Sequence, residues 1–184
     1  MRRLFWGIIV TIILCFCQCT PVIQAEPDKI KDIPLQTDAM TDMLSGFAAY
    51  SSFLGECRCE GIYRIPLHGS SKVQAFAYLT QFFEPALAEA VIEECTRWEE
   101  SVQSLVITPA DGIPVLTNDD RDKVRILTQD ANTVVFAREY NDCYQWGDCY
   151  LFRITMHKSG QGWKISTLEF EAQKNERMQR NETL

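Results

Sequence analysis

The sequence contains few of the residues, and none of the short motifs, from which active sites are usually built. Of its 184 residues only two are histidines, His68 and His157. It has no G-x-S-x-G pattern for a serine nucleophile, no G-x-x-x-x-G-K-[ST] pattern for a nucleotide phosphate and no H-E-x-x-H pattern for zinc. Asp119 and Asp120 lack the ligand spacing of an EF-hand and predict a polar turn. Because no nucleophile, base and oxyanion donor can be named together, we expect no catalytic site, no cofactor and no metal ion.

Basic residues are too few for a surface that binds nucleic acid. The chain has 18 Lys and Arg against 25 Asp and Glu, which gives a formal net charge of −7. Phosphate binding needs a basic patch, so we expect no nucleic-acid partner. An acidic surface suits a basic protein partner, although such a surface more often only meets water.

The sequence also lacks an apolar run long enough to cross a membrane, which takes about 18 residues or more. Its N-terminal run covers 14 residues, 4–17, follows two arginines and precedes a polar stretch that ends at Ala25. This layout is typical of a secretory signal peptide at residues 1–25. We therefore expect a periplasmic or secreted protein with no stable membrane insertion after cleavage. A retained membrane anchor is the alternative, and a lipidated cysteine in the leader is a weaker one.

Removal of the leader leaves a chain that fits one domain. It takes away two basic residues and no acidic one, so 16 basic and 25 acidic residues leave a net charge of −9. We expect a linker at residues 26–37, a single α+β domain at 38–172 and a charged tail at 173–184.

Three segments before residue 101 have the 3.6-residue spacing of amphipathic helices. The first begins at Thr37 or Asp38. In the second, Ser71 and Gln74 satisfy a capping-box pattern, and in the third Pro85 suits the first helical turn. Their apolar positions are Met40, Met43, Leu44, Phe47, Ala48 and Leu54, then Val73, Phe76, Ala77, Leu79 and Phe83, then Leu87, Val91, Cys95 and Trp98.

After Ser101 the period changes to two, and β-branched residues become dense. The strand-like segments are SLVIT, IPVLT, KVRILTQ, NTVVFAREY, CYLFRITMH and WKISTLEFEA. Turn signals separate the last four, and short turns of this kind join antiparallel neighbours into a meander. Helices first and hairpins second predict an α+β fold, in which N-terminal helices pack on a curved antiparallel sheet.

Five cysteines follow the leader, and two of them, Cys143 and Cys149, flank the strand connection in NDCYQWGDCY. Residues at equal distances from a turn face each other across a hairpin, and disulfides persist in exported proteins. We therefore expect a Cys143–Cys149 disulfide, with a ligand-binding tip that keeps free thiols, or a catalytic role, as alternatives. We also expect a second bridge, from Cys57 or Cys59 to Cys95, with the remaining cysteine unpaired.

Several segments of residues 70–172 together carry a resemblance to a known family. They are GWKISTLEF, the preceding hairpin strands VVFAREY and YLFRITMHKSG, the helical segment AFAYLTQFFEPALAEAV, and DGIPVLTNDDRDKVRIL before the meander. With these segments the chain resembles small secreted members of the nuclear transport factor 2-like superfamily. The resemblance implies a cone-shaped α+β domain, with helices on a strongly bent antiparallel sheet and a cavity at the open end. Some members are isomerases or dehydratases, whereas others bind ligands, form homodimers or act as bacterial immunity proteins, so fold alone does not settle function.

Four residues are candidates for a ligand pocket in such a cone: Arg125, Arg138, Arg153 and His157. Neighbouring strands can bring the three arginines together to hold an anion, although cross-strand pairing with Glu139 and Glu169 explains them nearly as well. The strand face of His157 either lines the cavity or meets solvent. For His68 we expect a surface or capping role.

The connection between the two cysteine-flanked strands carries Tyr144, Gln145 and Trp146, and its aromatic residues are types favoured as interface anchors. With the leader, the acidic charge and the resemblance, these residues favour a periplasmic protein that acts by protein–protein contact. An immunity-type inhibitor of a basic secreted toxin is the most concrete form of this hypothesis. The alternatives are a small-ligand carrier or isomerase-like enzyme that uses the cone cavity, and a structural factor of the cell envelope.

Overall fold

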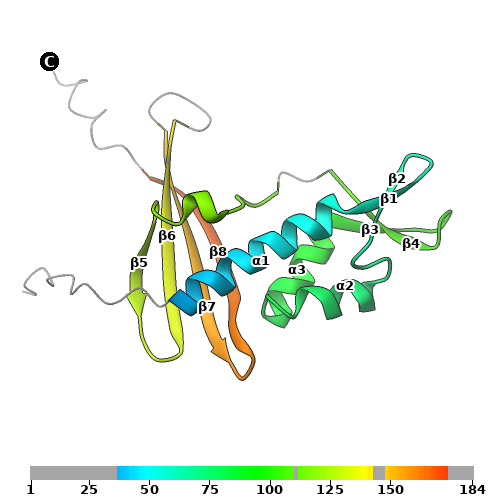
Figure 1. Cartoon of the computed structure of the whole chain (residues 1–184). Helices are drawn as coiled ribbons and strands as arrows, with labels where there is room; N and C mark the ends of the chain where they lie inside the picture. Colours follow the sequence, from blue (N-terminus) through cyan, green and yellow to red (C-terminus); the bar gives the residue numbers. More distant parts are fainter. Residues whose placement is uncertain (1–36, 110–111, 143–147, 174–184) are drawn as a thin grey trace, which may run out of the picture. The chain divides into compact units, whose positions relative to one another are not determined.

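The structure, a computed structural model, describes residues 37–109, 112–142 and 148–173 (Figure 1). These described residues belong to a single compact unit. Helices and antiparallel open sheets make this unit an α+β fold, as the sequence predicts. The elements are α1 (Thr37–Gly55), β1 (Cys57–Glu60), β2 (Tyr63–Pro66), α2 (Lys72–Leu79), α3 (Pro85–Cys95), β3 (Thr96–Glu99), β4 (Ser104–Ile107), the 3-10 helix η1 (Asn118–Asp120), β5 (Val124–Gln129), β6 (Thr133–Asn141), β7 (Cys149–Ser159) and β8 (Gly162–Gln173).

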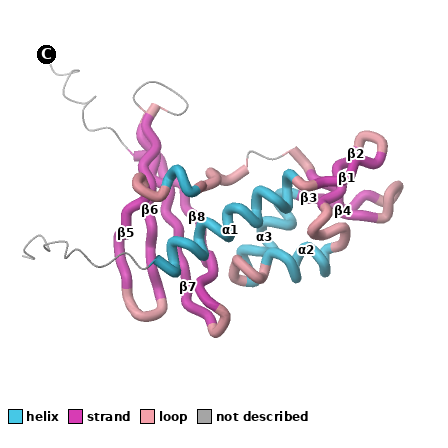
Figure 2. Tube along the Cα trace, in the orientation of Figure 1, coloured by secondary structure: helices cyan, strands magenta, loops and turns pink. Residues whose placement is uncertain are grey.

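The predicted meander is confirmed: four strands follow one another in the order β5–β6–β7–β8, and every neighbouring pair is antiparallel (Figure 2). The turn between β5 and β6 is fixed by Asp130, whose Oδ1 accepts the backbone N–H groups of Asn132 and Thr133 at 2.8 Å each. The register shifts at two places, between Ile126 and Thr128 and between Thr155 and Met156. Such irregularities twist a strand and change which side chains share a face.

The hydrophobic core lies between α1 and one face of this sheet. Phe47 of α1 contacts Phe152 of β7 with ring centroids 6.0 Å apart. The Trp163 backbone N–H, at the start of β8, donates to Asp42 Oδ2 of α1 over 2.9 Å. The even-numbered residues of β6 and β7 face α1, and those in the core are Val134, Phe136, Phe152, Ile154 and Met156, all at most 1% exposed.

Helices α2 and α3 begin at the signals that the sequence contains. The Ser71 side chain caps α2, and Pro85 is the first residue of α3. Between the two helices, Phe83 forms a parallel bridge with Ile165 of β8, and the Glu84 N–H donates to the Ile165 carbonyl over 2.9 Å. The α2–α3 connection therefore pairs with part of the β8 edge.

The third helix is shorter than predicted and ends at Cys95. Thr96 is extended, and its hydroxyl donates to the Ile92 carbonyl over 2.6 Å, so the chain leaves the helix directly into β3. Trp98 therefore lies in a strand opposite Leu105 of β4 and is 45% exposed. Its predicted place on the buried helical stripe is wrong, because the apolar spacing does not show the competing strand pairing.

Two small sheets, β1–β2 and β3–β4, complete the fold. The sequence predicted β4, within SLVIT, but not the pairing of either hairpin. The guanidinium carbon of Arg97 in β3 lies 5.9 Å from the ring centroid of Tyr63 in β2, which links the two hairpins. The predicted strand IPVLT, at residues 113–117, is wrong, since this segment forms no strand and leads into η1.

Candidate functional site

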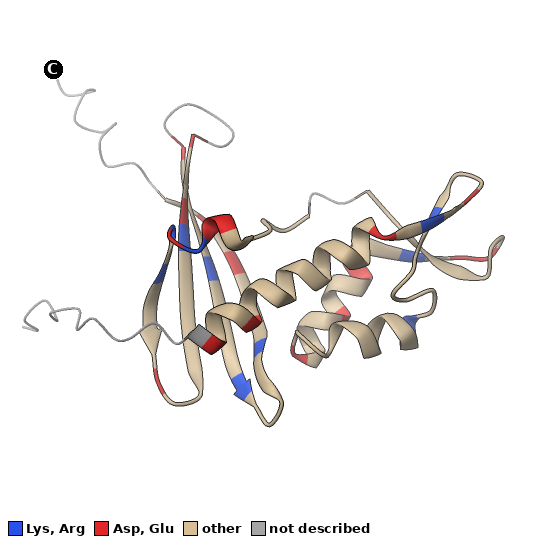
Figure 3. Ribbon diagram, in the orientation of Figure 1, with Lys and Arg blue, Asp and Glu red and all other residues tan. Residues whose placement is uncertain are grey.

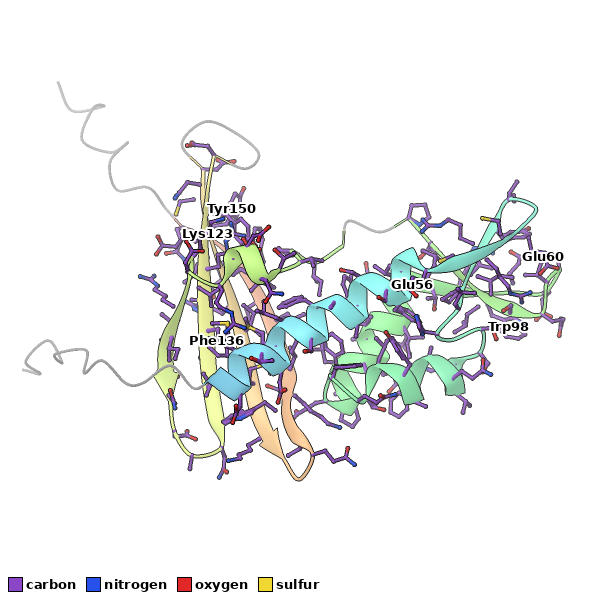
Figure 4. All side chains as sticks on the ribbon, in the orientation of Figure 1. Glu56, Glu60, Trp98, Lys123, Phe136 and Tyr150 are labelled. Atoms are coloured by element: carbon purple, nitrogen blue, oxygen red, sulfur yellow. The ribbon has the colours of Figure 1, made fainter. Side chains whose placement is uncertain are left out.

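Four aromatic side chains gather at the end of the sheet that leads into the β6–β7 connection. We call this group the aromatic surface, and its members are Tyr140, Tyr150, Phe152 and Phe170. Tyr140 lies opposite Tyr150 and Phe152 opposite Phe170 in the strand register. The Tyr150 and Phe170 rings stack at 5.0 Å, and the Tyr140 and Phe152 rings each meet Phe170 edge-on at 6.1 Å. Phe152 is 1% exposed and Phe170 39%, so the group extends from the core to the surface. Tyr150, one of its members, is labelled in Figure 4.

Arg138 connects the aromatic surface to η1. Its guanidinium carbon lies 4.2 Å from the centroid of the Tyr140 ring, within the range of a cation–π interaction. Its Nη1 lies 2.9 Å from Asp120 Oδ1, and the two side chains are 17% and 12% exposed, so water screens the pair little. Arg138 Nε is buried and has no hydrogen-bond partner among the described residues.

Asp120 is stabilised as a carboxylate. Its Oδ2 accepts the backbone N–H and the hydroxyl of Thr117 at 3.0 and 3.2 Å, and Lys123 Nζ lies 3.7 Å from Oδ1. Burial by itself raises the pKa of Asp120, but the Thr117 N–H and the charge of Arg138 outweigh it and hold this pKa below its ordinary value. The predicted polar turn at NDDRD is thus a short helix anchored to the sheet by an ion pair.

The predicted pocket of three arginines and His157 does not form as one site. Arg125 and Arg153 both lie opposite Ala137 of β6, on the sheet face away from α1, whereas Arg138 lies on the α1 face. Figure 3 marks basic positions on β5, β6 and β7, and strand alternation places Arg138 on the opposite sheet face from Arg125 and Arg153. The predicted meeting of all three arginines is therefore wrong. Arg125 and Arg153 share the face of Ala137, and Arg138, the next residue along β6, points to the opposite face.

Each of these basic residues instead has a carboxylate beside it. Arg125 pairs with Glu139, as the cross-strand alternative predicted, and Arg153 Nη1 lies 2.7 Å from Glu171. His157 Nδ1 lies 2.9 Å from Glu84 at the start of α3.

His68 is likewise paired, with Nε2 3.0 Å from Glu56 Oε2 and the ring stacked on Tyr78 at a centroid distance of 4.5 Å. This hydrogen bond to His68 lowers the pKa of Glu56. Both histidines thus hold neighbouring segments together, which fits the surface role expected for His68.

The cysteine pairing predicted from the sequence is not present in the structure. Cys57, Cys59, Cys95 and Cys149 are free thiols. Cys95 is 4% exposed on α3, in the core, whereas Cys57 and Cys59 lie on β1, so the second bridge that we expected does not form. The register opposes Cys149 to Asn141, which removes the basis for placing it opposite Cys143. Cys143 itself lies outside the described residues, as do Tyr144, Gln145 and Trp146, and their contact with a partner stays a prediction.

A buried tyrosine–thiol pair, which the sequence did not indicate, lies where α1 meets α3. The Tyr50 hydroxyl is 3.8 Å from Cys95 Sγ and accepts the Ile113 N–H at 3.5 Å, and the Tyr50 side chain is 3% exposed. Burial, with the neighbouring Cys95, raises the pKa of Tyr50 to about 12. Burial also raises the pKa of the Cys95 thiol.

We expect the stability of the protein to fall in alkali because of Tyr50. A phenol whose pKa is 10.0 unfolded and about 12 folded stabilises the fold below pH 10, and this contribution is lost as the pH rises to 12. The complete loss amounts to about 3 kcal/mol. Denaturant unfolding of the wild type and of Tyr50→Phe, measured from pH 8 to pH 11.5, checks this. The wild type should lose stability more steeply, and parallel profiles would contradict the assignment.

No family model matches the chain, and neither the curated proteins nor the solved structures contain a match to it. Within residues 37–109, 112–142 and 148–173, no three or more His, Cys, Asp or Glu side chains come together in a way that could hold a metal ion. The helices in these ranges also lack the length and apolar character that crossing a bilayer takes. The aromatic surface with Arg138 and Asp120 is therefore the candidate site that the geometry itself defines.

Proposed function

We propose that this chain is an exported binding protein that contacts a protein partner through the aromatic surface. The observation that carries the proposal is Phe170, a large apolar side chain that is 39% exposed although three other aromatic rings pack around it. Aromatic residues with an adjacent arginine are the side chains most enriched in the centres of protein interfaces.

The rigidity of this surface supports a role in binding. Tyr140, Tyr150 and Phe170 come from three neighbouring strands, and their rings contact one another, so little side-chain freedom remains to be lost when a partner covers them. The Arg138 side chain, stacked on Tyr140 and paired with Asp120, holds one border of the surface.

The partner that we propose is a basic secreted protein, which the chain would inhibit by covering it in the manner of an immunity protein. The excess of 25 acidic over 18 basic residues supports this choice, since complementary charge accelerates the encounter of two proteins. The pairing of His68, His157, Arg125 and Arg153 with carboxylates also supports binding over catalysis, because these groups already hold the protein's own segments together.

A nuclear transport factor 2-like cone with a ligand cavity is the second candidate, with the protein as a carrier or an isomerase-like enzyme. One observation favours it: Arg138, Asp120 and the aromatic surface share the sheet face that α1 packs against, which is the inner face of such a cone. A small ligand can be titrated into the protein while the nuclear magnetic resonance signals of the Tyr140 and Tyr150 rings are followed. A shift of these ring signals on binding would favour this candidate over the first.

The test begins with co-purification of a tagged chain from its native host under non-reducing conditions, and the partner obtained is then used to measure affinity. We expect Phe170→Ala to weaken binding by about 30-fold, the loss of about 2 kcal/mol that defines an interface hot spot. Isothermal titration calorimetry with the purified partner gives this ratio directly.

Two variants serve as matched controls. Leu127→Ala removes a side chain of equal exposure, 40%, from β5, and Trp98→Ala removes an exposed aromatic from another sheet. Both should retain wild-type affinity. If Trp98→Ala weakens binding and Phe170→Ala leaves it unchanged, the partner binds at the hairpins and the proposed surface is wrong.

A further inference from the structure

The hairpin β1–β2 carries two free thiols on a single side of a strand. Cys57 and Cys59 are separated by one residue of β1, and in a strand such residues point to the same face. Cys59 is exposed and Cys57 half-buried, so neither residue is enclosed in the core. Across the hairpin, Cys59 lies opposite Arg64 of β2.

The strand keeps these two thiols from bonding to each other. Side chains two residues apart on a strand are about 6.7 Å apart at their bases, because each residue advances the chain by 3.3–3.4 Å. A disulfide needs Cβ atoms within about 4.5 Å. Direct oxidation of the pair would therefore require β1 to separate from β2, where four residue pairs hold the register from Cys57–Pro66 to Glu60–Tyr63.

A metal ion can bridge the sulfurs of Cys57 and Cys59 at a separation that is too large for a disulfide bond. Metal–thiolate bonds of about 2.3 Å allow one ion to bridge sulfurs about 4.6 Å apart. Each Sγ lies one bond beyond its Cβ, so two thiols that lean toward each other across a 6.7 Å gap reach this separation without movement of the backbone.

We propose that Cys57 and Cys59 form a two-thiolate site for Cu(I). Soft thiolates select Cu(I), and this ion is stable with two ligands, whereas structural zinc takes four. The described residues supply no third His, Cys, Asp or Glu at the site, which disfavours zinc. Binding releases one proton from each thiol, and the two thiolates with one Cu(I) carry a net charge of −1.

Arg64 already provides for that charge. Arg64 Nη2 lies 4.0 Å from Cys57 Sγ and donates to the Leu54 carbonyl over 2.9 Å. In the thiol form, Cys57 Sγ also donates to that carbonyl, at 3.3 Å. When the Cys57 proton leaves, the guanidinium continues to satisfy the Leu54 carbonyl and places a positive charge beside the new thiolate.

The test is an anaerobic titration of the reduced protein with Cu(I) held by the chromogenic chelator bathocuproine disulfonate. We expect Cys57→Ser to withdraw one equivalent of copper fewer than the wild type, and Cys59→Ser likewise. Because a single ion needs both sulfurs, the double variant should lose no more than either single variant. Cys95→Ala, which removes a buried thiol, should keep the full amount.

Arg64→Gln provides a second readout, because it leaves both sulfurs in place. Its affinity for Cu(I), measured by competition with the chelator, should be about tenfold lower than that of the wild type, because one neighbouring positive charge is lost. Additive losses in the two serine variants, equal copper uptake by all variants, or no withdrawal from the chelator would each overturn the proposal. None of these outcomes bears on the aromatic surface, whose variants leave Cys57 and Cys59 unchanged.

Discussion

Replacement of Phe47 by alanine is expected to lower the free energy of unfolding by about 3–5 kcal/mol. The side chain is 0% exposed and is the point at which α1 contacts the Phe152 ring of the sheet. Truncation removes an aromatic ring from a close-packed core and leaves a cavity that neighbouring side chains only partly fill. Chemical denaturation followed by circular dichroism gives the change directly.

An exposed position on the same helix provides the control. Ser51→Ala should alter stability by less than about 0.5 kcal/mol, because Ser51 faces solvent. A double-mutant cycle with Phe152→Ala should show that the two truncations together cost less than their sum, since both remove the same contact. A loss below 1 kcal/mol in Phe47→Ala would mean that α1 does not pack on the sheet through this residue.

The elements that could be predicted from the sequence are those whose signals are local. The α1 residues Met40, Met43, Leu44 and Phe47 recur at helical spacing, and all four are buried. The meander could be predicted for a similar reason, because dense β-branched segments alternate with short turns over residues 124–173. Periodicity and turn residues are signals that span only a few positions. They can therefore be recognised without knowing which distant segments pack together.

The parts that could not be predicted depend on pairing between distant segments. Val73 has helical spacing but is 79% exposed. The buried face of α2 is formed by Ala75 and Leu79, and Val73 does not lie on that face. Trp98 fits the α3 stripe only if the helix continues, and pairing of β3 with β4 ends it. The spacing of apolar residues therefore indicates that a segment is a helix or a strand. In α2 and α3 it did not indicate which residues are buried or where the helix ends.

The candidate site illustrates the same limit. The aromatic residues Tyr140, Tyr150 and Phe170 were each visible as strand residues, but their meeting requires the register of β6, β7 and β8. The prediction of a Cys143–Cys149 disulfide was wrong for the same reason. It assumed that Cys149 lies opposite Cys143, whereas Cys149 lies opposite Asn141, two residues earlier in the chain. Register depends on turn lengths and bulges, which a single sequence does not reveal.

Asp120→Asn is the second substitution with a large expected effect, a loss of about 3 kcal/mol in the free energy of unfolding. Arg138 is 17% exposed and would keep its charge while losing its ionised partner, in a place where its Nε already lacks an acceptor. The exposed pair Arg125–Glu139, on the same sheet, is the matched control. Glu139→Gln should cost less than about 1 kcal/mol, because water screens that pair.

The double variant Asp120→Asn/Arg138→Met separates an unpaired charge from lost packing. Methionine covers Tyr140 without carrying a charge, so the double variant should recover most of the stability that Asp120→Asn loses. Acid provides an independent test. Since the folded pKa of Asp120 is depressed below its ordinary 3.8, its contribution is complete above that pH and is lost as the pH falls through the folded value. The difference in free energy of unfolding between the wild type and Asp120→Asn should therefore become smaller below pH 3.8. A difference that stays constant there would mean that Asp120→Asn destabilises the packing of η1 and not the ion pair.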